Sequence, residues 1–137
     1  MPETDLATVL FFEGHRDALD LYLTLENRLT TSFPDVTRSV QKTQITFRNP
    51  RVFACVSFAR VRRKAELPPG WLVLTLGLPS PLPSPRVAVS VEVRPGRWTH
   101  HIVLSTPEEL DSELMDWVQT SYAFAQMHLR SGSSRRP

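Results

Sequence analysis

The sequence predicts an α+β fold, a two-layer sandwich in which an antiparallel β-meander of five or six strands carries an N-terminal and a C-terminal helix on one face. Apolar residues recur at three- and four-residue spacing near both ends of the chain, and they alternate with period two between those ends. Proline–glycine pairs separate the alternating segments, as turns do. The chain has 137 residues, enough for one core, so we expect a single globular domain over 1–129.

The first helix is predicted over about 15–31. Its apolar stripe consists of Ala18, Leu21, Tyr22, Leu25 and Leu29. Proline restricts the preceding residue to extended geometry, so the Phe33-Pro34 pair ends this helix. The apolar residues 9–12 before it are expected to form a short helical turn against the core.

The strands follow from period-two alternation. The alternating or apolar segments are 44–48, 52–59, 71–78, 87–93 and 98–104. Pro69-Gly70 and Pro95-Gly96 fit type II turns, and their short spacings indicate hairpins, hence a meander. Half of the twelve prolines lie in 68–85, and we interpret the run LPSPLPSP as a semi-rigid connector.

The second helix has the clearest start signal. In Thr106-Pro107-Glu108-Glu109 the threonine caps, the proline takes the first helical position and Glu109 completes a capping box. The predicted helix covers 107–129, and residues 130–137 are expected to form a disordered tail. We expect the centre of the core to join this helix to the sheet through Trp117, Leu114, Leu74, Leu76, Val89 and Val91.

The strands have a second face, opposite the helices. Alternation assigns to it Gln44, Thr46, Phe53, Cys55, Ser57, Trp71, Val73, Thr75, Ala88, Ser90, Thr99, His101 and Val103. This set is too apolar to be merely solvated and too polar for a large second core. We therefore expect the open face to bind a partner, a ligand or a second copy of the chain.

Charge is segregated along the chain. Residues 36–104 carry eleven Lys/Arg against two acids, a net of +9, whereas residues 1–35 have a net of −5 and residues 105–137 a net of −2. The total of +2 therefore hides a basic middle between acidic ends. The basic segment marks the part of the molecule that an anion approaches.

Four segments of the chain match a known pattern. They are Phe33-Pro34-Asp35-Val36, Lys42-Thr43-Gln44-Ile45-Thr46-Phe47, the strand from Trp98 to Leu104, and Ser105 to Tyr122. Their order over roughly 9–125 resembles the bacterial family catalogued as domain of unknown function 5655, with Gln44 in place of a usual aromatic residue. The resemblance implies no established activity. A similar domain follows a predicted nuclease-like domain in larger proteins, which implies an accessory role near nucleic acid.

Cysteine and histidine do not suggest a reactive or metal site. Cys55 lies in an apolar strand, which favours a structural thiol. His100 and His101 are adjacent on a strand and point to opposite faces, so they cannot share a metal ion. His100 is expected in the core or at its rim, and His101 on the open face. No metal ion or other cofactor is expected.

The leading hypothesis is a non-catalytic binding or accessory domain that uses the open sheet face and a basic rim to bind a protein, another copy of the chain or a small anion. The alternative is a nucleic-acid-associated accessory domain that contacts the phosphate backbone through the basic segment. The candidate binding residues are Lys42, Arg48, Arg60, Arg62, Arg63, Lys64, Trp71 and His101. No catalytic residue is predicted, because no nucleophile elbow, phosphate loop or zinc-protease motif occurs.

The expected compartment follows from two features that the sequence does not show, a signal peptide and a membrane-spanning apolar stretch. The first residues are acidic where a signal peptide is positively charged, and no stretch approaches the roughly 20 apolar residues that span a bilayer. One cysteine cannot form an internal disulfide. We therefore expect a cytoplasmic protein without a membrane partner.

Overall fold

Alternating residues build one antiparallel sheet of six strands in the computed structural model, which describes the backbone of residues 5–134 and the side chains up to residue 127. The strands are β1 (Thr37–Val40), β2 (Gln44–Arg48), β3 (Val52–Ser57), β4 (Leu72–Leu78), β5 (Val87–Arg94) and β6 (Arg97–Leu104). The helices are α1 (Leu6–Phe11), α2 (Leu19–Ser32) and α3 (Ser112–Ser134), with single 3₁₀ turns at η1 (Arg16–Ala18), η2 (Lys64–Glu66) and η3 (Pro107–Glu109). The predicted α+β class is confirmed.

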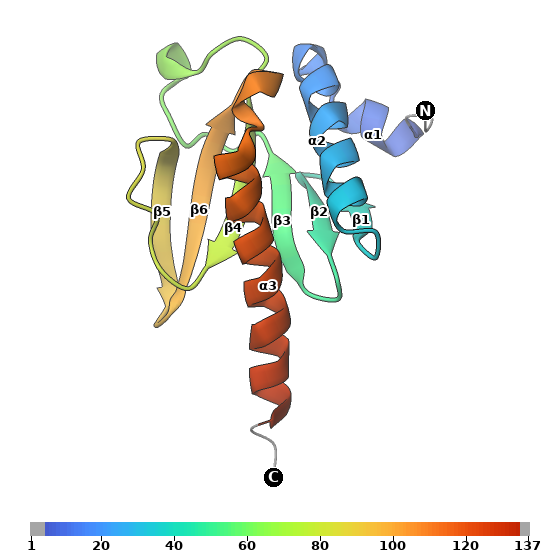
Figure 1. Ribbon diagram of the computed structural model, residues 1–137. Coiled ribbons are helices and arrows are strands. Elements are labelled where there is room, and N and C mark those ends of the chain that lie inside the picture. The colour runs from blue at the N-terminus through green and yellow to red at the C-terminus, as the bar shows by residue number, and fades with distance from the viewer. Residues whose placement is uncertain (1–4, 135–137) are drawn as a thin grey trace.

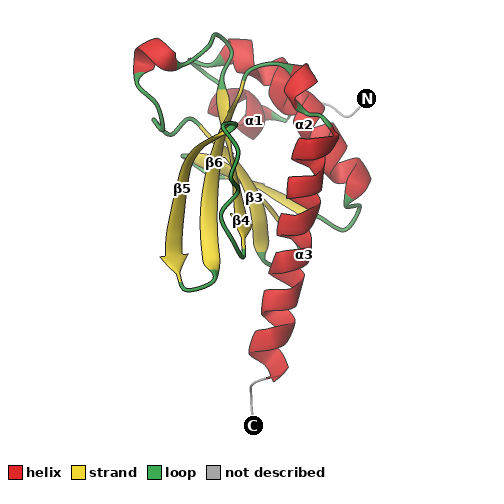
Figure 2. Cartoon of the chain, turned by 60° about the vertical axis from the view of Figure 1, so that its left-hand side comes forward, coloured by secondary structure: helices red, strands yellow, loops and turns green. Residues whose placement is uncertain are grey.

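The two long helices cover one face of the sheet (Figures 1 and 2). The even-numbered residues of β4 point toward them, and Leu72, Leu74 and Leu76 are at most 1% exposed. Leu25 of α2 and Leu114 of α3 are buried in the same cluster. The helical stripes and the strand alternation therefore meet as the sequence predicts, and this face is the hydrophobic core.

The strand order corrects the predicted meander. It is β1-β2-β3-β4-β6-β5, so β6 lies between β4 and β5. The chain from 79 to 86 crosses β6 on the helix side, where the Leu82 N–H donates to Nε2 of the buried His100 at 3.1 Å. An extended proline-rich segment advances about 3.1 Å per residue, so these residues span the length of a strand such as β4. The prolines thus make a straight crossover rather than a hairpin.

Arg86 fastens the end of this crossover to the start of α3. Its Nη1 lies 2.9 Å from a carboxylate oxygen of Asp111 and 3.0 Å from one of Glu113, and its Nη2 donates to the Glu109 carbonyl at 2.6 Å. The guanidinium also lies over the ring of Trp117, at 5.5 Å from its centroid. Trp117 is therefore only partly buried and covers an arginine, so its predicted place at the core centre is wrong.

The capping box occurs as predicted, but it caps a different element. The Glu109 carboxylate accepts from the N–H groups of Ser105 at 2.7 Å and Thr106 at 3.0 Å. These bonds cap η3, which is a separate turn before α3. The helix α3 begins at Ser112, and there the Asp111 carboxylate accepts from the Leu114 N–H at 3.0 Å. The helix continues to Ser134, past its predicted end at 129; residues 135–137 of the expected tail lie outside the described residues.

Irregular pairing turns several side chains to the face opposite the predicted one. The register of β2 and β3 shifts next to Phe53, and Phe53 packs on the helix side against Phe33 and Tyr122. A second shift, after Val87, pairs Val89 with His101 on the open face. The bulges therefore contradict the predicted open-face position of Phe53 and the predicted core position of Val89.

The second bulge has the same effect farther along β5. Val91 pairs with Thr99 on the open face and is 46% exposed, whereas Ser90 pairs with His100 on the helix side. The predictions for Val91 and Ser90 were wrong for the same reason as that for Val89. A one-residue shift exchanges the two faces of a strand.

Two of the predicted turns have the backbone geometry that the sequence indicated. Gly70 and Gly96 have φ values of +69° and +77°, which type II turns require at their third residue. A Cβ on Gly70 would lie 3.1 Å from the Asp17 carbonyl oxygen, and the Gly70 N–H donates to the Asp17 carboxylate at 3.1 Å. Gly70 therefore brings the end of the β3–β4 loop into contact with η1.

Within the described part of the chain, no helix combines the length and the apolar composition that crossing a bilayer requires.

Candidate functional site

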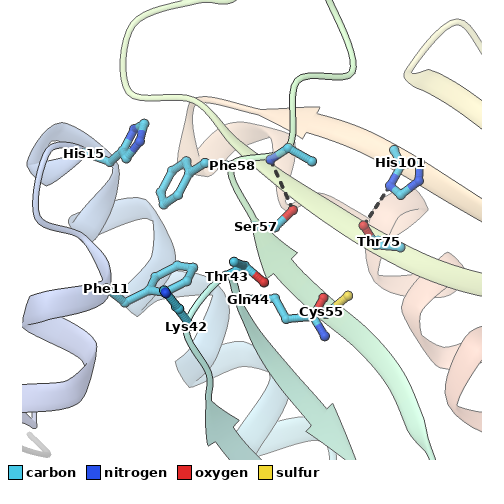
Figure 3. Close-up of a pocket in the computed structure, with 11 residues that line it drawn as sticks. Phe11, His15, Lys42, Thr43, Gln44, Cys55, Ser57, Phe58, Thr75 and His101 are labelled. Carbon is cyan, nitrogen blue, oxygen red and sulfur yellow. Dashed lines mark hydrogen bonds between the residues drawn. The ribbon is translucent and has the colours of Figure 1, made fainter.

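A cavity of about 550 Å³ lies on the sheet face opposite α2 and α3, where the start of β2 and the end of β3 meet the α1 region. Its lining residues come from four strands, the end of α1 and three connecting segments (Figure 3). They are Phe11, His15, Lys42, Thr43, Gln44, Cys55, Ser57, Phe58, Ala59, Thr75 and His101. Ligand pockets are commonly about 300–1,000 Å³, so the cavity has the size of a small-molecule site.

The polar end of the pocket is a row across three strands. Cys55 of β3 pairs with Thr75 of β4, and Thr75 pairs with His101 of β6, so the three side chains share one face. The Oγ1 atom of Thr75 lies 2.9 Å from Nδ1 of His101. Gln44 and Ser57 form the neighbouring pair on β2 and β3. Strand register therefore fixes a cluster of hydrogen-bonding groups without any loop.

The opposite end of the pocket is aromatic, as Figure 3 shows for Phe11, His15 and Phe58. The rings of His15 and Phe58 stack with centroids 3.8 Å apart and an interplanar angle of 6°. The Phe11 ring lies 5.6 Å from that of Phe58. Trp71 contacts His15 and Phe58 edge-on, at 5.9 and 5.5 Å, from outside the pocket lining.

The aromatic end depends on the position of α1, which an arginine holds beside β1. Arg38 lies 2.8 Å from the Asp5 carboxylate, donates to the Thr8 hydroxyl at 2.9 Å and lies 3.6 Å from Glu26 of α2. The Asp5 carboxylate also accepts from the Thr8 N–H at 2.9 Å and caps α1. These bonds lower the pKa of Asp5, chiefly those from Thr8 and then that from Arg38. Arg38 therefore positions α1 and does not face a ligand.

The electrostatics of the lining rest on one lysine. Burial raises the pKa of the Cys55 thiol, against the smaller opposing effect of its hydrogen bond with Thr75. Burial lowers the pKa of His101. Both groups are therefore neutral at pH 7, and Lys42 brings a positive charge to the lining. The pocket can hold a ligand that has an anionic group, a flat apolar part and polar atoms for the strand row.

The structure brings together some of the predicted binding residues. Lys42 and His101 line the same pocket, and Trp71 supports its aromatic end. The loop that carries Arg60, Arg62, Arg63 and Lys64 follows the lining residues Phe58 and Ala59, so these cations lie at the same end of the sheet as Lys42.

Arg48 lies elsewhere. It ends β2, roughly 13 Å along the strand from Gln44 at about 3.3 Å per residue, and it is partly buried. At that far end of the sheet Arg97 lies near Arg94 and Arg51; burial, and then these two arginines, lower its pKa. The basic middle of the sequence therefore forms two separate groups rather than one surface.

Sequence reasoning missed Phe11, His15, Thr43 and Phe58. The segment 9–12 was expected to lie against the core, and Phe12 does so at 1% exposure. Its neighbour Phe11 reaches the other face of the sheet because α1 lies at the edge beside β1 (Figure 1). Period and composition carry no signal for a helix that contributes to both faces.

Some residues lie on the open face as predicted but do not line the pocket. Val73 pairs with Ser57 and Val103 and is fully buried. Thr46 pairs with Cys55 and is 2% exposed. The open face therefore also has buried residues beside the pocket. Among the residues that the structure describes, no group of three or more His, Cys, Asp or Glu could hold a metal ion.

Comparison with known proteins gives a family without an assigned role. No curated protein and no solved structure is significantly similar to the chain. A family model described as a domain of unknown function (DUF5655) matches residues 10–125, which include the whole sheet and the residues that line the pocket. The chain belongs to the DUF5655 family.

Proposed function

We propose that this protein is a non-catalytic binding domain whose open-face pocket takes a small organic anion. The observation that carries the proposal is the position of Lys42 on a cavity of about 550 Å³ that is aromatic at one end and polar at the other. Such pockets surround a ligand with apolar contacts and orient it with a few polar groups. A concave site of this kind favours a small ligand over a flat interface with a protein or a second copy.

The lining supports binding rather than covalent chemistry. A nucleophilic cysteine is a thiolate, which a neighbouring cation or base stabilises. Burial keeps the Cys55 thiol protonated, and the His101 imidazole faces the Thr75 hydroxyl. We further propose that the protein acts in a bacterial cytoplasm, whose reducing conditions keep such a thiol free.

The experiment compares two nearly isosteric probes by isothermal titration calorimetry. Benzoate carries a carboxylate on a flat ring, and benzamide carries a neutral amide on the same ring. We expect benzoate to bind with a Kd of order 1 mM, as a ligand of its size allows, and benzamide to bind at least about tenfold more weakly.

Two lysine variants locate the effect. Lys42→Met should reduce benzoate affinity to that of benzamide, because it removes the cation and keeps an unbranched side chain only one atom shorter. Lys64→Met removes an exposed cation outside the pocket lining and should leave the affinity unchanged. Equal binding of the two probes, or equal effects of the two variants, would contradict the proposal.

A second candidate function is association with nucleic acid through its phosphates. The observation that favours it is the exposed loop with Arg60, Arg62, Arg63 and Lys64. Counterion release predicts that such binding weakens steeply as salt increases. An electrophoretic shift at low salt with single-stranded DNA, duplex DNA and RNA tests it; Arg62→Glu with Arg63→Glu should abolish the shift, and no shift with any of the three refutes this candidate.

A further inference from the structure

The basic loop and the pocket wall are one continuous piece of chain. Phe58 and Ala59 line the pocket, and the exposed Arg60 follows directly. Of the four loop cations, Arg63 pairs with Glu66 at 3.4 Å, and its side chain is still 86% exposed. Arg60, Arg62 and Lys64 form no ion pair with any described residue. An exposed pair contributes little, so these charges remain available to an anion.

Both ends of the loop are fixed next to the pocket. At its start, Phe58 stacks on His15 at 3.8 Å. At its end, the Gly70 N–H donates to the Asp17 carboxylate at 3.1 Å, and Trp71 contacts the Phe58 ring at 5.5 Å. Residues 15–17 thus contact both ends of the loop. The start and the end of the loop therefore lie beside the aromatic end of the pocket, on the side of Phe58, whereas η2, which carries Lys64, lies at the tip of the loop and away from α1 (Figures 1 and 2).

The lining itself matches the two kinds of surface that a nucleobase presents. A base has a flat face, which stacks on aromatic rings, and an edge of hydrogen-bond donors and acceptors. Phe11 and Phe58 supply rings at one end, and the Gln44 amide, the Ser57 hydroxyl and the Thr75–His101 pair supply polar atoms at the other. Lys42 belongs to the same lining (Figure 3).

We propose that the ligand class is a nucleoside phosphate, whose base enters the open-face pocket and whose phosphates contact Lys42 and the first two loop cations, Arg60 and Arg62. This inference rests on the proposed function, because it uses the same pocket, and it adds the loop as a second contact. A free nucleotide and the end of a single strand share this chemistry, and the experiment separates them.

Calorimetry with four probes tests the combination of base and phosphate. Adenosine carries the base alone, inorganic triphosphate carries the anion alone, and adenosine triphosphate carries both. We expect adenosine triphosphate to bind at least about tenfold more tightly than either half, since one ligand then engages two adjacent contacts. A single-stranded octanucleotide of thymidine is the fourth probe; if it binds more tightly than adenosine triphosphate, the source is a strand, and otherwise it is a free nucleotide.

Two double variants, each of which reverses two positive charges, test where the phosphates bind. Arg60→Glu with Arg62→Glu should weaken adenosine triphosphate at least about tenfold and weaken benzoate much less, because benzoate is too short to contact the loop. Arg51→Glu with Arg94→Glu makes the same change of charge at the opposite end of the sheet and should have a much smaller effect. Thr75→Val alters the polar row and should weaken adenosine while leaving inorganic triphosphate unchanged.

Three results would overturn the inference. Inorganic triphosphate could bind as tightly as adenosine triphosphate, the two double variants could weaken binding equally, or adenosine triphosphate could fail to compete with benzoate. In each case Lys42-dependent benzoate binding would still support the proposed function, and its loss alone would refute that function. The two proposals therefore fail on different measurements.

Discussion

The two faces of this sheet are made by the same strands and do different things. On β4, Leu74 and Leu76 point under α3 and are at most 1% exposed. Between them Thr75 points the other way, bonds to His101 and lines a cavity. Adjacent residues of one strand thus belong to the core and to the candidate site. Strand alternation therefore places residues of the core and residues of the candidate site next to each other along one strand.

The cations divide in the same manner. Arg38 and Arg86 are used to fasten α1 and the crossover, and each contacts two carboxylates. Arg60 and Arg62 lie on an exposed loop without such partners among the described residues. A sum of charge over the sequence counts all four equally. Their contacts assign the first two to the fold, and the proposed ligand uses the other two.

The largest expected effect is on the helix side. Leu74→Ala should reduce the free energy of unfolding by about 2–5 kcal/mol, because it leaves a cavity in a fully buried cluster. Thr75→Val, one residue along, should change it by about 1 kcal/mol or less while it breaks the contact with His101. Urea denaturation measures both. Similar losses for the two variants would contradict the division between the faces.

Removal of the Arg86 contacts that join the crossover to α3 should have an intermediate effect on stability. Arg86→Met should destabilise the fold by about 1–2 kcal/mol, since it removes charge-assisted bonds to Asp111, Glu113 and the Glu109 carbonyl. Part of this loss should disappear at high salt, which screens exposed ion pairs. Lys64→Met is the control, because it removes an exposed cation without such bonds. An unchanged urea midpoint for Arg86→Met would show that the Arg86 contacts do not stabilise the crossover.

The adjacent residues His100 and His101 predict how the stability of the fold depends on pH. Burial is the main cause that lowers the pKa of His100, and it also lowers the pKa of His101. A lowered folded pKa means that the unfolded chain binds protons first, so the stabilisation is complete above the unfolded value of about 6.5 and is lost as pH falls below it. The melting temperature should therefore decrease between about pH 7.5 and pH 5.5.

The double variant His100→Gln with His101→Gln checks this origin. Glutamine keeps an acceptor that can serve the Leu82 N–H, which bonds to His100 in the folded chain. The variant should show a flatter dependence of melting temperature on pH over the same window. A slope as steep as that of the wild type would assign the pH dependence to other groups.

The smallest expected effect is in the loop. Arg62→Glu should change the free energy of unfolding by no more than about 0.5 kcal/mol, as exposed substitutions usually do. A larger loss in a urea titration would mean that the loop takes part in the fold, and its role as a ligand contact would then be in doubt.

The sequence predicted the elements better than their pairing. The stripe of α2, the type II turns and the alternation of β4 were read correctly, because each depends on neighbouring residues. The exchange of β5 and β6 depends on where the crossover lies, and the faces of Phe53 and Val89 depend on bulges that no local pattern marks. The helical stripe placed Trp117 at the core centre together with Leu114, whereas in the fold the Arg86 guanidinium lies over the Trp117 ring.

Only part of the candidate site could be predicted from the sequence, because local patterns do not show how distant segments pack. Strand alternation placed Cys55, Thr75 and His101 on one face, and the start of a strand marked Lys42. Phe11 and His15 come from a segment more than 25 residues earlier in the chain, and only the packing of α1 at the edge of the sheet brings them there. The split of the basic segment into two groups likewise needs the direction of β2.

Alkylation of Cys55 by iodoacetamide tests the central claim most directly, because it is the only cysteine in the chain and it lines the pocket. If the open face holds an accessible pocket, the native protein should react without unfolding, more slowly than a free thiol because burial raises the pKa of Cys55. Benzoate should slow the reaction further, and benzamide should not. Labelling at the rate of global unfolding, unaffected by benzoate, would contradict the claim.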